Sequence, residues 1–262
     1  MRRSRFADLT LGAALILITA GVAGAQTEPA TFSPLETAVA CAPPPSMDGP
    51  PPQSLHLIGA QDVMPRALYG TRDLLLVDGG TAAGVQLGQQ FFVRRVNDFG
   101  MARGARAAGT RTAGWIRIVA VNESTAIATV DHACGPLLAR DFLVPFVAPV
   151  LPAGADRDET PGQPDFTSLG RIVVGNEERV ATGPGDFVLI DQGSDQGVVP
   201  GARFALYRDV GASGYREIGV RGLPLASIGE AIVISTSASM SLTRITRARD
   251  AVYGGDYVVP RK

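Results

Sequence analysis

The chain has 262 residues, two cysteines, two histidines and a formal net charge of −1. A nearly neutral chain has no general attraction to nucleic acid or to anionic lipid, so neither is an expected partner. The few cysteines and histidines do not have the spacing of a zinc site, and we expect no metal and no cofactor.

The first 25 residues have the three parts of a secretory signal peptide. Three arginines come first, the apolar run 9–22 follows, and the small residues 23–25 end the segment. This order predicts cleavage after Ala25 and a periplasmic or secreted protein. An uncleaved N-terminal anchor is the alternative, although the apolar run is short for a membrane span. Cleavage would leave 21 basic and 24 acidic residues, a net charge of −3, and no membrane span.

Residues 26–54 hold eight prolines and almost no periodic apolar pattern. Such a segment is typical of a polyproline-like or disordered spacer, and we expect a Pro-rich lead. It contains Cys41, whose candidate disulfide partner is Cys134, the other cysteine of the chain. Export favours this disulfide, which would be worth about 4–5 kcal/mol in the chain-entropy treatment. Unpaired thiols and a lipid anchor on Cys41 are the alternatives.

An internal repeat organises the rest of the chain. The segment Asp73–Arg95 returns without a gap as Asp186–Arg208, with nine identical positions. The similarity continues, after a shift of two residues, from 114–145 to 229–260. We therefore predict two copies of one unit, at 55–146 and 170–262, joined by a Pro-rich and acidic linker at 147–169.

Short β-branched runs separated by Gly, Pro, Asp and Asn predict strands throughout both copies. The predicted strands of copy one are 55–60, 73–78, 90–96, 115–121, 125–132 and 141–146, and those of copy two are 170–175, 186–191, 203–208, 230–236, 239–247 and 256–260. The predicted fold is therefore all-β, with two tandem repeats of a small six-stranded antiparallel β-barrel or sandwich. Residues 74–77 and 187–190 are apolar throughout, so we expect both faces of these two strands to be covered.

The repeated segment carries the pattern D-x-G-[TS]-x-x-G-V-x-x-G-x-x-F between two predicted strands. Its spacing matches no phosphate-binding loop, and glycine and aspartate at these positions are typical of a tight turn. The predicted structural turn residues are Asp78, Gly80, Gly84 and Gly88, with Asp191, Gly193, Gly197 and Gly201 in the second copy.

This loop, the glycines expected to begin a strand at Gly114 and Gly229, and the ending Gly255–Pro260 resemble small β-barrel domains of bacterial envelope proteins. They are similar to the C-terminal domain of the flagellar assembly protein FlgT, to domains that follow LysM modules in exported proteins and, more loosely, to the β-domains of the cell-shape protein MreC. The resemblance implies a non-enzymatic binding or scaffolding role at the cell envelope and no catalytic residues.

The loops that differ most between the copies, 97–113 and 209–228, are candidate binding loops, since variable loops on a repeated scaffold often carry function. Their arginines suit carboxylates or phosphates of a cell-wall polymer or an acidic envelope protein, and Trp115 suits a sugar ring or the core. The candidate binding residues are Arg103, Arg106, Arg111, Trp115, Tyr215, Arg216 and Arg221. The alternative is that these loops are solvated hairpin tips without a binding role.

We therefore expect an exported, non-enzymatic envelope protein that binds or scaffolds a cell-wall polymer or a protein partner. The alternative from another class is a periplasmic hydrolase whose site joins Asp131 and His132 to Ser124. Copy two has Thr246 and Arg247 in place of the Asp–His pair, which favours a strand histidine without a catalytic role.

Overall fold

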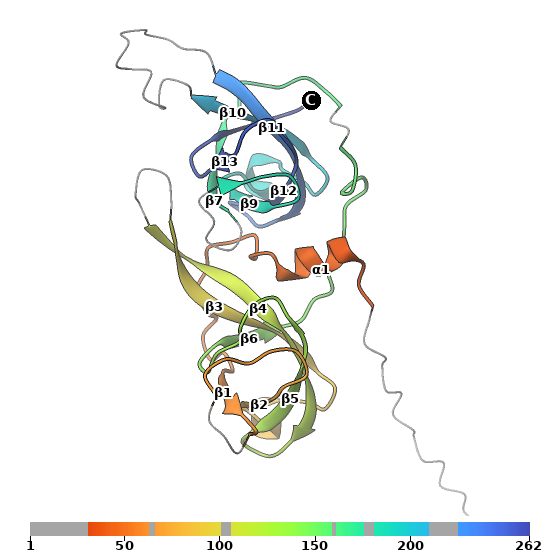
Figure 1. Cartoon of the computed structure of the whole chain (residues 1–262), viewed down its shortest axis with the longest axis vertical. Coiled ribbons are helices and arrows are strands. Elements are labelled where there is room, and N and C mark those ends of the chain that lie inside the picture. The colour runs from red at the N-terminus through yellow and green to blue at the C-terminus, as the bar shows by residue number, and fades with distance from the viewer. Residues whose placement is uncertain (1–30, 63–65, 101–105, 159–160, 176–180, 210–224) are drawn as a thin grey trace, which may run out of the picture.

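The computed structural model of the chain contains two β-rich units with a short helix between them (Figure 1). It describes residues 31–62, 66–100, 106–158, 161–175, 181–209 and 225–262. The predicted signal peptide, Arg103, Tyr215, Arg216 and Arg221 lie outside these residues. Within them, no helix combines the length and the apolar character that crossing a membrane requires.

Unit one contains the strands β1 (Leu57–Ala60), β2 (Leu74–Val77), β3 (Gln90–Gly100), β4 (Arg106–Val121), β5 (Ala126–Ala133) and β6 (Phe142–Pro145). Unit two contains β7 (Gly170–Gly175), β8 (Ala181–Thr182), β9 (Phe187–Ile190), β10 (Arg203–Asp209), β11 (Leu225–Thr236), β12 (Ser241–Ala248), β13 (Val252–Tyr253) and β14 (Tyr257–Pro260). The all-β prediction is confirmed. The short strands β8 and β13 were not predicted, and β4 and β11 begin well before their predicted starts.

The two units share one strand order. Unit one is an antiparallel sheet in the order β1-β2-β5-β4-β3-β6, and unit two is a closed barrel that joins β7-β9-β12-β11-β10-β14 into a ring. In unit two β14 pairs with β7 and closes the barrel. In unit one the equivalent seam is narrower, with a bridge between His56 and Phe142 and a hydrogen bond from the Leu57 N–H to the Asp141 carbonyl. The duplication itself stays a prediction from the sequence.

Each unit is built around its own apolar core. In β5, Ala126, Ala128 and Val130 are buried while the residues between them are half-buried, as the alternation of side chains along a strand requires. The core of unit two is built likewise and includes Phe204, Leu206 and Ile245. The repeated sequence pattern thus supplies inward-facing residues to each unit separately.

The repeated loop forms the same tight turn in both units. A 3-10 turn, η1 (Thr81–Ala83) or η4 (Ser194–Gln196), ends at a glycine in the left-handed region, where Gly84 has φ 78° and Gly197 has φ 77°. A Cβ on Gly80 would lie 2.1 Å from the Asn122 carbonyl oxygen, so the backbones approach too closely there for any side chain. These constraints are those expected of a structural turn.

The lead differs from the predicted spacer, because it contains helix α1 (Pro34–Cys41). Ser33 and Glu36 form a capping box: the Ser33 N–H donates to Glu36 at 2.7 Å, and the Glu36 N–H donates to Ser33 Oγ at 3.3 Å. Pro34 at the first helical position needs no hydrogen-bond acceptor for its nitrogen. The S-x-x-E signature was present in the sequence, but the surrounding prolines dominated the composition on which the prediction depended.

Helix α1 lies between the two units and contacts both of them (Figure 1). Leu35, Ala38, Val39 and Ala42 pack against unit two, at the i, i+3, i+4, i+7 spacing of one helical face. The opposite side of the helix packs against unit one through Ala40 and Cys41. The helix therefore joins the units rather than extending away from them.

The connector between the units also packs against unit two. Ala155 is buried, and its carbonyl accepts a hydrogen bond from Arg244 at 3.0 Å. The Gly154 carbonyl accepts one from Arg203 at 2.7 Å. Residues of the predicted linker thus form part of the folded surface of unit two.

Candidate functional site

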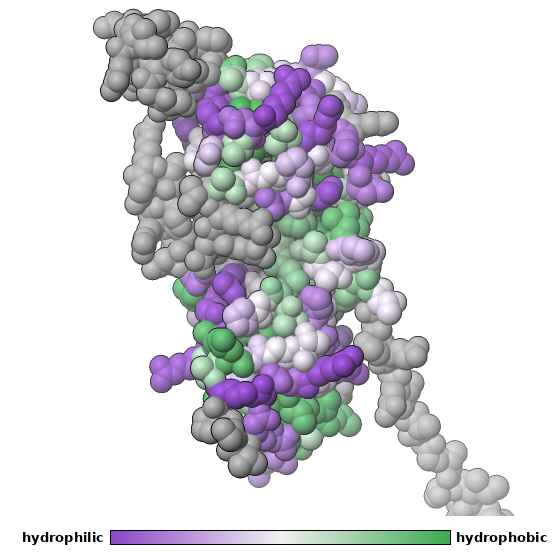
Figure 2. All heavy atoms as spheres, in the orientation of Figure 1, coloured by the Kyte–Doolittle hydropathy of each residue, from purple (hydrophilic) through white to green (hydrophobic). Residues whose placement is uncertain are grey.

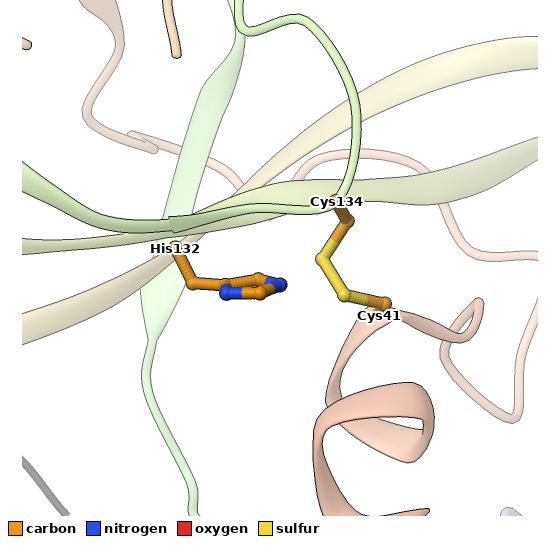
Figure 3. A group of neighbouring side chains, drawn as sticks. All are labelled: Cys41, His132 and Cys134. Carbon is orange, nitrogen blue, oxygen red and sulfur yellow. A yellow bond between two sulfur atoms is a disulfide. The ribbon is translucent and has the colours of Figure 1, made fainter. Parts of the chain in front are cut away.

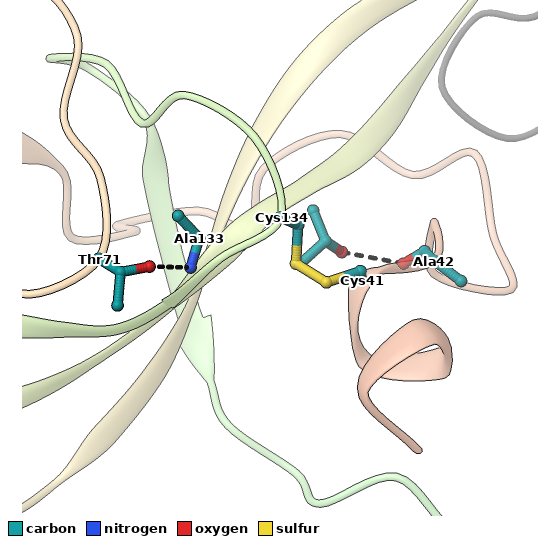
Figure 4. The surroundings of a disulfide bond; sticks show 6 residues. Cys41, Ala42, Thr71, Ala133 and Cys134 are labelled. Carbon is teal, nitrogen blue, oxygen red and sulfur yellow. Dashed lines mark hydrogen bonds between the residues drawn. A yellow bond between two sulfur atoms is a disulfide. The ribbon is translucent and has the colours of Figure 1, made fainter. Parts of the chain in front are cut away.

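The junction between α1 and unit one is a disulfide bond, which confirms the predicted pairing. Cys41 is the last residue of α1, and Cys134 directly follows β5, 93 residues later in the chain. Their Cα atoms lie 5.4 Å apart, within the range that disulfides span. The bond covalently joins the lead to the end of β5 (Figure 4).

Hydrogen bonds support the disulfide on both sides. Thr112, buried in β4, donates through its hydroxyl to the Ala42 carbonyl at 3.0 Å, directly after α1. On the strand side, the Ala133 N–H donates to the Thr71 hydroxyl at 3.2 Å (Figure 4). The Cys134 N–H donates to the Ala113 carbonyl at 2.9 Å. The position of each sulfur atom is therefore held by hydrogen-bonded backbone as well as by the covalent bond.

His132 lies beside this disulfide (Figure 3). One ligand-type atom from each of Cys41, His132 and Cys134 lies within 4.8 Å of the others. A thiolate is the form of cysteine that binds a metal ion, and both sulfur atoms are bonded to each other. In the oxidised protein these three residues therefore form a structural junction.

The His132 imidazole is stacked on Trp115, with ring centroids 4.5 Å apart and planes 17° from parallel. Trp115 is 5% exposed and packs with Phe32, Phe92 and Phe146 as well. The chain itself encloses the indole ring of Trp115. This supports a place in the core over contact with a sugar ring.

The alternative hydrolase site is not assembled. Asp131 accepts hydrogen bonds from Arg117 at 2.8 Å and from Gln90 at 3.1 Å, while its neighbour His132 stacks on Trp115. Ser124 lies in the exposed turn before β5. At about 3.3 Å per residue along a strand, its hydroxyl is roughly 25 Å from His132, so the three residues cannot form a triad.

The arginines predicted for a binding loop in unit one lie partly on strands. The structure corrects this prediction for Arg106 and Arg111, which belong to β4, because β3 and β4 continue pairing as far as Gly100 and Arg106. Arg111 is half-buried, and its guanidinium lies beside Gly135. The glycines 114 and 229 likewise lie inside β4 and β11 rather than at the start of a strand. Pairing within this long hairpin outweighs the loop-like composition of Gly and Ala.

The repeated aspartates of the turn bind backbone N–H groups. Asp78 Oδ1 accepts from the His56 N–H at 2.6 Å, and Asp191 Oδ1 accepts from the Arg171 N–H at 2.6 Å. His56 Nδ1 also lies 3.3 Å from Asp78. Each aspartate therefore ties the loop to the strand that begins its unit, a structural role.

Each unit contains an Arg–Asp ion pair at equivalent positions, and neither pair was among the predicted sites. Arg95 binds Asp141 through two hydrogen bonds of 2.6 Å each, and Arg208 binds Asp256 at 3.0 and 2.8 Å. Asp256 raises the pKa of Arg208 through this hydrogen-bonded contact. Both members of each pair occupy matching positions in the repeat, and that coincidence was the signal that could have revealed them.

The comparisons with known proteins give no family for the chain. No protein-family model matches it, and no curated protein matches it. The function must therefore be argued from the geometry of these two units and of the junction between them.

Proposed function

We propose that this chain is an extracytoplasmic, non-enzymatic protein that binds or scaffolds a protein partner of the cell envelope. The observation that carries the proposal is the junction in which α1 contacts both units and is joined to unit one by the Cys41–Cys134 disulfide. Disulfides persist in oxidising compartments, which fits the predicted signal peptide and export.

The junction suits a binding protein because it holds two surfaces in one arrangement. Ordering flexible parts on binding costs free energy, so a preorganised pair of units binds with less entropic loss than two units on a free linker. Asp78, Asp191 and the two Arg–Asp pairs are engaged in the fold. These charged side chains thus stabilise the fold of each unit.

Two parallel experiments test this proposal on the mature chain, residues 26–262. Photo-crosslinking in cells that export the protein should give discrete crosslinked protein species. In the second, the protein is sedimented with purified peptidoglycan sacculi at low and at high salt. Salt-sensitive sedimentation that is lost when Arg103, Arg106 and Arg111 are changed to Ala would assign a cell-wall polymer instead.

A matched control keeps the sedimentation result interpretable. Arg72 and Arg140 are also exposed arginines of unit one, and their change to Ala should leave any sacculus binding unaltered. A protein that neither crosslinks to another protein nor sediments with sacculi would contradict the binding proposal. Hydrolysis of an envelope substrate by the purified chain would contradict its non-enzymatic part.

A further inference from the structure

The outer surface of unit two has an apolar face that α1 covers. This covered face is formed by outward side chains of β7, β9, β11 and β12, namely Val173, Phe187, Leu189, Ile232, Ile234 and Leu242. Phe187, Leu189 and Ile234 are only 1–2% exposed. Leu35, Ala38, Val39 and Ala42 of the helix segment lie against them. The face is therefore buried because the helix packs on the outside of the barrel, together with Met47 of the lead and Leu151 and Ala155 of the connector.

Unit one has an apolar face at the equivalent positions. Leu76 pairs with Ile127 in the sheet as Leu189 pairs with Leu242, and Ala120 pairs with Ile127 as Ser235 pairs with Leu242. This register makes the residues of unit one that match the covered face Ile58, Leu74, Leu76, Val119 and Ile127. We call these five residues the open face.

The open face is accessible to solvent. Ile58 is 51% exposed, and Leu74 and Val119 are each 42% exposed. Apolar residues scattered singly over a surface need no explanation, but adjacent strands that present them together indicate an interaction site. Figure 2 shows hydrophobic surface on the outside of the lower unit, as well as beside the waist where α1 lies.

The other outer apolar face of each unit is covered by the chain itself. In unit one, Phe92 and Trp115 lie under Phe32 and α1. In unit two, the connector crosses β14 and β10. There the Asp165 N–H donates to the Pro260 carbonyl at 2.8 Å, and Phe166 packs against Tyr207 in an edge-to-face arrangement. Each unit thus has two outer apolar faces. Within the part of the chain that the structure describes, three of these four faces are covered, and the open face is exposed.

We propose that the open face binds an amphipathic helix of the protein partner. This inference rests on the proposed binding function. The occupant is a helix because the covered face, which has the same strand order and register, receives one. Its contact stripe should resemble that of α1, with small and medium apolar residues at i, i+3, i+4 and i+7.

Two polar replacements make this contact weaker than the one within unit two. Arg117 lies where unit two has Ile232, and it is paired with Asp131 at 2.8 Å. Thr125 lies where unit two has Met240. A smaller apolar area with a charged rim binds more weakly and is tolerated when unoccupied. The helix partner therefore binds reversibly, whereas α1 is part of the chain and is covalently joined to unit one by the Cys41–Cys134 disulfide.

The probe for this site is a fluorescent peptide of residues 31–47 that carries the Cys41→Ser change. Its binding to the full mature chain is followed by fluorescence anisotropy. We expect saturable binding to the unchanged protein and an affinity lower by about tenfold or more with Leu74→Asp or Ile58→Asp, since each change puts a charge on the buried contact. Leu74→Gln, which adds no charge, should give a smaller loss in the same direction.

Val199→Asp is the matched control, because Val199 is 60% exposed and lies in a loop of unit two. It should bind the peptide as the unchanged protein does. Absence of peptide binding, or equal binding by the Leu74→Asp and Val199→Asp proteins, would overturn the assignment. Self-association that Leu74→Asp abolishes would give the face to a second copy of the chain and would equally overturn it.

The two proposals can fail separately. Peptide binding is measured with purified protein and does not depend on any envelope partner. The peptide could fail to bind while crosslinking in cells persists in the Leu74→Asp variant. That result would overturn only the proposal for the open face and would leave the proposed binding function in place.

Discussion

The two units share strand order, core positions and turn geometry, yet they differ in what covers the outside of β2 and of its equivalent β9. In unit two, all four residues of Phe187–Ile190 are buried, whereas in unit one Leu74 is exposed. The difference comes from α1 and the connector. The helix packs its broad apolar face against unit two and its opposite side against unit one, and Leu151 and Ala155 of the connector join the cluster on unit two. Segments outside the repeat thus give two units of the same strand order different outer surfaces.

The largest effect is expected from removing the disulfide. Changing Cys134 to Ser releases a closed loop of 93 residues, and the free energy of unfolding should fall by about 4–5 kcal/mol. Chemical denaturation under oxidising conditions measures this loss. Reduction of the unchanged protein is the control and should give the same loss. An unaltered unfolding midpoint would show that the disulfide does not hold the junction.

Truncating side chains at equivalent positions should reduce the free energy of unfolding more on the covered face than on the open face. Phe187→Ala removes a buried ring beneath α1 and should cost about 3–5 kcal/mol. Leu74→Ala, at the matching position of unit one, should cost less than about 1 kcal/mol because Leu74 is already half in water. Denaturation of both variants provides the comparison. Equal losses would mean that the two faces are equally covered and would contradict the difference in burial between Phe187 and Leu74.

The hydrogen bond from Thr112 to Ala42 tests the support of the junction. Thr112→Val preserves the side-chain shape but leaves the buried Ala42 carbonyl without its donor. The expected loss of stability is about 1–3 kcal/mol. If the variant unfolds at the same denaturant concentration as the unchanged protein, the hydroxyl does not stabilise the position of α1.

The smallest effect is expected at the helix cap. Ser33→Ala removes the side chain that accepts from the Glu36 N–H and should cost about 1 kcal/mol. Ser33→Asp supplies another capping oxygen and should restore most of that stability. Thermal unfolding of both variants gives the comparison. A Ser33→Asp protein no more stable than Ser33→Ala would argue against capping as the cause.

Much of the strand arrangement could be predicted, because period-two burial and turn residues recur locally in each copy. The role of the lead could not be predicted in this way. Helix α1 is short, and its stability depends on packing against two surfaces that are distant in the sequence. The exposure of Leu74 could not be predicted for the same reason. Residues 74–77 and 187–190 are equally apolar, and what distinguishes them is that α1 and the connector pack against the second segment.

The candidate binding residues show a similar division. Arg111 sits on a loop-like stretch of Gly and Ala, yet strand pairing extends through it. Trp115 suits either a ligand or a core, and the lead that encloses it joins unit one through a cysteine far away in the chain. Local composition therefore indicated which residue types could bind a ligand. It could not show which neighbours surround each residue in the fold.

Nuclear spin relaxation of the backbone amides tests most directly whether α1 holds the two units in one arrangement. We expect one rotational correlation time shared by the strands of unit one and of unit two in the oxidised protein. Ala38→Asp, which places a charge between α1 and unit two, should separate the two values. Different correlation times for the two units of the unchanged protein would show that α1 does not hold them in one arrangement.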